Sequence, residues 1–185
     1  ALSIITVGLF AAPLPTASFA ALMNAVLLYM ADHSLVVVPL RGAMPEAYSR
    51  ADFTWLTAAK KRIMIIIEGI AAVVGFCLAL FGLQVFAVWY QGSVAPSQTL
   101  LFGAGIYCVL FAIEVSHFTY LSSIGRLREC SRVILVKSLF CAVSVVLVAM
   151  NGMVDWAFWA LATITFTFST VPLTVMAKRA PQSPA

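Results

Sequence analysis

The sequence predicts an all-α integral membrane protein, a bundle of about five membrane-spanning helices. The chain is 63% hydrophobic and only 10% charged, and its mean hydropathy is +1.03. Soluble domains carry roughly a quarter charged residues. The apolar residues form long unbroken runs, which indicate helices and not the short alternating strands of a membrane barrel. The 185 residues leave room for a single bundle.

Five apolar runs are long enough to cross a bilayer, at roughly 18–28 residues each against the ~20 that a span needs. We predict spans at about 17–40, 63–90, 99–122, 133–150 and 156–177. The opening stretch, 1–12, is apolar but short, and we expect it to end a partial helix of a longer protein. Residues 1–179 then form one transmembrane lobe, and 180–185 form a cytoplasmic tail.

The basic residues predict the orientation of these spans. All 11 Lys and Arg residues lie between the first two spans, at the junction of the third and fourth, or after the fifth. The connections 91–98 and 151–155 carry none. Because basic loops stay in the cytoplasm, we predict a multi-pass protein of the bacterial inner membrane with a cytoplasmic C-terminus. The net charge of +4 then reflects topology and does not indicate a nucleic-acid partner.

The sequence also predicts the structure of the connection 41–62 and of the region around Pro172. Residues 41–62 are expected to form a long cytoplasmic loop, in which Asp52 caps a short amphipathic helix on the membrane surface. Pro172 is expected to kink the fifth span near its inner end.

Catalytic and metal-binding chemistry is not indicated. The sequence has no nucleophile–base–orienter trio, no glycine-rich phosphate loop and no Cys/His spacing typical of a metal site. Its four cysteines are interpreted as small buried hydrophobic residues. We therefore expect no enzyme activity, no cofactor and no metal.

Ionisable side chains inside the apolar runs are the candidate functional groups, since a charge in hydrocarbon is costly. They are Asp32, His33, Glu68, Glu114 and His117. Counted from the basic ends at 1.5 Å per residue, they lie roughly 9–15 Å deep. All fall in the cytoplasmic half of the bundle, which indicates a shared polar region.

Glu114 and His117 are spaced i,i+3 and can interact on one helix face. A histidine that titrates near neutral pH beside a carboxyl is a candidate proton relay. The alternative is that these groups only bond neighbouring helices. The adjacent Asp32 and His33 point about 100° apart, so at most one faces a shared cavity. Glu68 is either a site residue or the partner of a nearby interfacial arginine.

Three basic residues near the cytoplasmic rim are candidates for contact with an anionic head group: Arg41, Arg62 and Lys137. Their placement is also explained by membrane topology alone. Lys137 is expected just inside the fourth span, so no Lys or Arg is predicted deep in the bundle.

Three short motifs resemble polysaccharide flippases of the multidrug/oligosaccharidyl-lipid/polysaccharide exporter superfamily. The first is the stretch from Pro39 through Arg50-Ala-Asp52 to Trp55, which is similar to the loop after the eighth helix of that family. The second is Trp89-Tyr-Gln-Gly92, and the third is the stretch from Leu121 to Glu129, which contains Gly125-Arg126. Their order and spacing carry the resemblance, which extends over about 6–179.

The resemblance implies the C-terminal lobe of a twelve-helix flippase. Such proteins move undecaprenyl-pyrophosphate-linked oligosaccharide across the membrane for surface polysaccharide synthesis, and the missing N-terminal lobe would complete the cavity. A drug/cation antiporter or lipid II flippase of the same superfamily is an alternative. A non-transporting membrane subunit is another.

Overall fold

The computed structural model describes residues 13–179, apart from the side chains at positions 13, 14, 32–36, 38, 40, 41 and 179. All regular structure in this range is helical, which confirms the predicted fold class. The elements are α2 (Pro13–Ser49), α3 (Phe53–Trp89), α4 (Gln98–Ser123), α5 (Leu127–Met150), η1 (Val154–Trp156), α6 (Ala157–Thr165), η2 (Phe166–Thr170) and α7 (Val171–Arg179).

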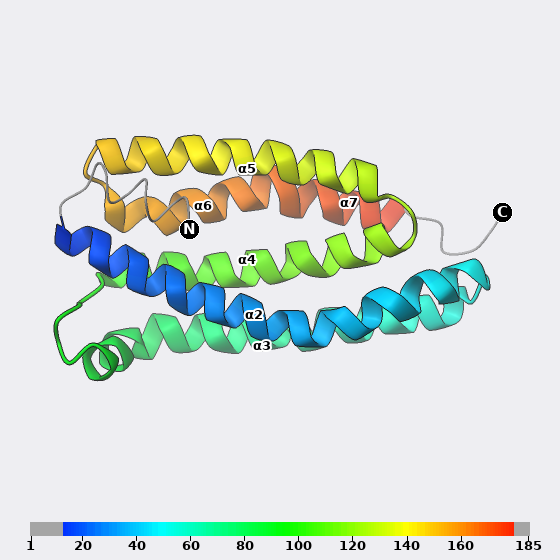
Figure 1. Ribbon diagram of the computed structural model, residues 1–185, viewed down its shortest axis with the longest axis horizontal. Helices are drawn as coiled ribbons and strands as arrows, with labels where there is room; N and C mark the ends of the chain where they lie inside the picture. The colour runs from blue at the N-terminus through cyan, green and yellow to red at the C-terminus, as the bar shows by residue number, and fades with distance from the viewer. Residues whose placement is uncertain (1–12, 180–185) are drawn as a thin grey trace.

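Successive long helices run in opposite directions (Figure 1). The α2–α3 turn, the α4–α5 turn and the end of α7 therefore lie at the same end of the bundle. We call this the basic end, because it carries Arg50, Lys60, Lys61, Arg62, Arg126, Arg128, Arg132 and Lys178. Helix α4 is central and packs against α2, α3, α6 and α7.

Four helical segments are long and apolar enough to cross a membrane: Phe53–Trp89, Gln98–Ser123, Leu127–Met150 and Val154–Lys178. They correspond to the second to fifth predicted spans. The first predicted span lies in α2, whose described apolar part is the shorter segment Pro15–Ala31. The chain is thus a multi-pass helical membrane protein.

The outer surfaces of α3 and α5 are apolar along most of their length. Such continuous faces are unfavourable in water and suit contact with lipid tails. Their most exposed large side chains are Ile65, Val73, Phe76, Val88, Leu135 and Leu139.

The long loop predicted over 41–62 is wrong. Helix α2 continues to Ser49, and α3 begins at Phe53, so only a short turn separates them. The predicted Asp52 cap is confirmed, since its Oδ1 accepts a hydrogen bond from the Trp55 backbone N–H at 3.0 Å. The surface helix and the second span are one continuous helix. Helix α2 tolerates Pro39 and Pro45 and bends along its length, as expected where prolines remove backbone donors (Figure 1).

Helices α3 and α4 approach most closely at two glycines. A Cβ atom on Gly75 would lie 2.7 Å from the Gly105 carbonyl oxygen, and one on Gly105 would lie 2.6 Å from the Gly75 carbonyl oxygen. Small residues of this kind let helix backbones pack together within a membrane, where hydrophobic exclusion contributes little.

The last span contains a wide turn just before Pro172, while the kink expected at Pro172 stays a prediction. Between α6 and α7, residues Phe166–Thr170 form one π-helical turn, and the Val171 N–H bonds the Phe166 carbonyl. A proline at position 172 cannot donate to the Phe168 carbonyl and its ring crowds that oxygen. The wider turn relieves this crowding, and such turns often occur at functional sites.

Candidate functional site

The most deeply placed charges described in the structure form an ion pair between α4 and α5. The Lys137 Nζ donates to both carboxylate oxygens of Glu114, at 2.7 and 2.8 Å. Glu114 is 3% exposed and Lys137 is 8% exposed. The Phe111 ring centroid lies 5.8 Å from the same Nζ, so the ammonium also has an aromatic neighbour.

The pair lies near the middle of its helices. Lys137 is ten residues beyond Leu127, where α5 begins, and Glu114 is nine residues before Ser123, where α4 ends. At 1.5 Å per residue both lie about 13–15 Å from the basic end. The expectation that no basic residue lies deep in the bundle is therefore wrong. The depth of Lys137 was counted from Val133, the predicted start of the fourth span, although α5 begins six residues earlier.

His117 is buried one turn closer to the basic end, but it has a different partner. Its Nδ1 lies 2.8 Å from the Ile113 carbonyl oxygen, a contact within α4. The structure therefore brings Glu114 to Lys137, while the hydrogen bond of His117 stays within its own helix. Their i,i+3 spacing places Glu114 and His117 on neighbouring turns, but the hydrogen-bond partner of the carboxylate is Lys137 on another helix.

Glu68 does not pair with Arg62, which is exposed. The ion pairs among the described side chains are Arg50–Glu46, Arg126–Glu129 and Lys137–Glu114. Glu68 is half-buried on α3, and its Oε1 is buried without a hydrogen-bond partner. Positions 32, 33 and 41 belong to α2, but the side chains of Asp32, His33 and Arg41 lie outside the described part of the structure.

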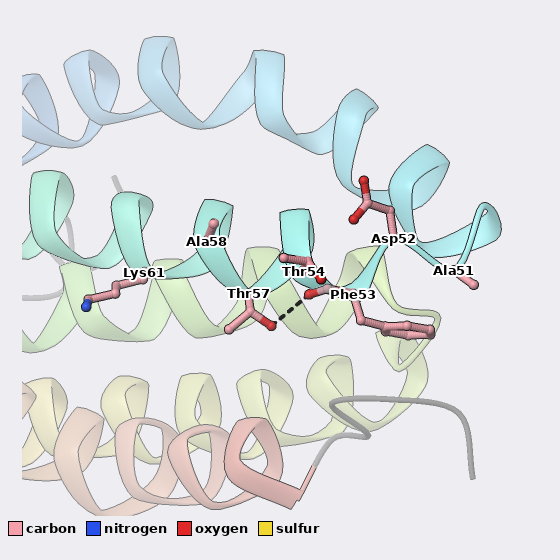
Figure 2. A pocket seen from close by; sticks show the side chains of 7 residues that line it. All are labelled: Ala51, Asp52, Phe53, Thr54, Thr57, Ala58 and Lys61. Atoms are coloured by element: carbon pink, nitrogen blue, oxygen red, sulfur yellow. Dashed lines mark hydrogen bonds between the residues drawn. The ribbon is translucent and has the colours of Figure 1, made fainter.

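An open pocket lies at the tip of the α2–α3 hairpin (Figure 2). It is lined by Ala51, Asp52, Phe53, Thr54, Thr57, Ala58 and Lys61. Because it lies at the basic end, outside the membrane-spanning core, it is distinct from the polar region expected between the helices. Lys61 is the basic side chain that lines it.

No protein-family model, no curated protein and no solved structure matches the chain. The fold and the buried charges define its class, a multi-pass helical membrane protein with an ion pair between two of its spans. Within residues 13–179, no group of three His, Cys, Asp or Glu side chains is placed to hold a metal ion.

Proposed function

We propose that the chain is one lobe of a membrane transporter that flips a lipid-linked oligosaccharide, with Glu114 and Lys137 as its polar centre. The observation that carries this proposal is the buried ion pair. An apolar pair of similar volume would hold two helices together at least as well, because desolvation offsets much of the attraction between buried charges. Charges retained at this depth are therefore candidates for a task other than stability.

The pair has the chemistry that a phosphate-bearing head group requires. Lys137 is a cation placed deep enough to meet a pyrophosphate inside the bundle. In the resting state Glu114 neutralises it, with both carboxylate oxygens in contact with Nζ. An incoming phosphate would compete with Glu114 for the ammonium and release it to a new partner. When Lys137 exchanges Glu114 for a phosphate, the ion pair that joins α4 and α5 is lost. Substrate entry is thereby coupled to a change in the packing of these two helices.

Oligosaccharide as the cargo is supported by the motifs that resemble flippases. Gly125 adopts a φ of +86° in the α4–α5 turn, and Gly92 adopts +76° after α3, so both motifs mark helix ends as the resemblance requires. Pro39 does not end a helix, and that motif lends no support. A second lobe, which the resemblance implies, would supply the other wall of the pathway.

Complementation tests the function. The full-length gene, whose product would carry both lobes, is expressed in a bacterium that lacks its own surface-polysaccharide flippase, beside the double variant Glu114→Leu/Lys137→Met and the exposed control Ser138→Ala. We expect the native chain and the control to restore surface glycan, and the double variant to fail at equal membrane abundance. A fully active double variant would make the pair structural. Failure of the well-expressed native chain against several glycans would favour another cargo or a non-transporting subunit.

We also propose that the basic end faces the cytoplasm, because basic segments are retained there. Thr54 at the basic end and Ser93 at the opposite end are both exposed. In a background with Cys77 replaced by alanine, a membrane-impermeant maleimide should label Ser93→Cys in intact cells. Thr54→Cys should react only after lysis. The reverse pattern would contradict this orientation.

A further inference from the structure

Helix α7 is a short, separately held end of the last span. It covers only Val171–Arg179 and follows the π-helical turn, where the regular hydrogen-bond ladder is interrupted. Pro172 removes a further backbone donor at its start. Because of these two features, the last span bends most easily at the junction between η2 and α7.

Two cations from other elements hold the far end of α7. The Lys60 Nζ, from α3, donates to the Ala177 carbonyl at 3.3 Å. The Arg126 Nη1, from the α4–α5 turn, donates to the Met176 carbonyl at 3.2 Å. Carbonyls in the last turn of a helix lack partners within it and carry partial negative charge, so cations bind there favourably.

Each cation is itself oriented by a neighbour. The Lys60 Nζ lies 4.3 Å from the centroid of the Tyr120 ring on α4. The Arg126 guanidinium binds the Glu129 carboxylate through two of its nitrogens. The contacts therefore join α3, α4 and α5 to α7, and we call Lys60 and Arg126 the latch.

The latched helix lies between the ion pair and the basic end. The Thr170 hydroxyl contacts the Leu110 carbonyl at 3.5 Å, while Met176 contacts Arg126. These two contacts show how the last span lies along α4. The stretch 171–175 runs beside the part of α4 that contains Glu114 and His117. Leu173 and Ala177 are buried in one apolar cluster with Leu121 and Cys130, which closes this end of the bundle.

We infer that α7 is a gate at the basic end, hinged at the π-helical turn and Pro172 and latched by Lys60 and Arg126. Release of the two carbonyls lets α7 move away from α4 and α5 and opens a route from the basic end to the Glu114–Lys137 pair. The latch and the hinge stand on the contacts alone, whereas the gate's role in transport rests on the proposed function.

Cys130 reports the position of α7, because it is fully buried in the cluster that includes Leu173 and Ala177. Cys108 is equally buried but lies in the main core, so it reports general loosening. The full chain in lipid nanodiscs is treated with N-ethylmaleimide, and mass spectrometry follows the two cysteines separately. The variants are Lys60→Gln, Arg126→Gln and their combination, with the exposed neighbours Lys61→Gln and Arg128→Gln as charge-matched controls.

We expect the double variant to raise the alkylation rate of Cys130 by roughly tenfold, the effect of losing at least one charge-assisted hydrogen bond from a local opening. Cys108 should stay unchanged, and the controls should stay within about twofold of the native chain. An unchanged Cys130 rate in the double variant, or a parallel rise at Cys108, would overturn the gate. If Cys130 responds as expected but the full-length protein restores no glycan, the latch stands and the proposal of oligosaccharide transport fails.

Discussion

Removing one member of the Glu114–Lys137 pair is expected to destabilise the bundle by about 3–5 kcal/mol, because the remaining charge stays buried without a partner. Glu114→Leu leaves the Lys137 ammonium unpaired between α4 and α5. Lys137→Met leaves the Glu114 carboxylate in the same position. Replacing both at once removes both charges and should return the free energy of unfolding close to that of the native chain. Equilibrium unfolding in mixed micelles measures each value.

The double variant distinguishes a direct contact from two independent losses. Ser138→Ala, an exposed neighbour on α5, serves as the control and should leave the free energy of unfolding unchanged. Strictly additive effects in the double variant would contradict a direct interaction between the two side chains.

The helices were predictable wherever one physical pattern dominates the sequence. The apolar runs of α3, α4, α5 and the combined span Val154–Lys178 are much longer than a globular helix needs, and Asp52 is a strong capping residue at the start of α3. The α2–α3 connection was mispredicted because Pro39, Pro45 and nearby charges all favour a loop locally. In the structure, packing of α2 against α3 and α4 keeps the helix intact through both prolines. Tertiary contacts overrode the local preference.

The candidate site was predictable in its members but not in its pairing. Glu114 and Lys137 were both singled out, one as a buried acid and the other as a basic residue near the rim. Their contact joins helices α4 and α5, and the spacing of residues along one helix cannot reveal which side chain on another helix lies opposite. A count from the true start of α5 would have placed Lys137 at the depth of Glu114. The basic residues at 126–132 obscured that start, because they belong to the helix but not to the apolar run.

The second large effect is expected at the closest approach of two helices. In Gly75→Leu, the new side chain would begin with a Cβ atom 2.7 Å from the Gly105 carbonyl oxygen, which is backbone and cannot rotate away. Helices α3 and α4 must then separate along their shared face. We expect a loss of at least about 3 kcal/mol in the free energy of unfolding, at the upper end of overpacking effects. The same micelle unfolding experiment measures this loss.

Gly69→Leu is the matched control, since it makes the same substitution in the same helix. Nothing lies within 4 Å of a Cβ atom at position 69, which faces outward. Leucine favours the helix by up to about 1 kcal/mol over glycine, so this variant should be neutral or slightly more stable. The two substitutions should therefore change the free energy of unfolding differently. The reason is that position 75 contacts α4 and position 69 does not. Equal losses in both variants would show that α3 and α4 do not meet at Gly75, and the central packing described above would then be wrong.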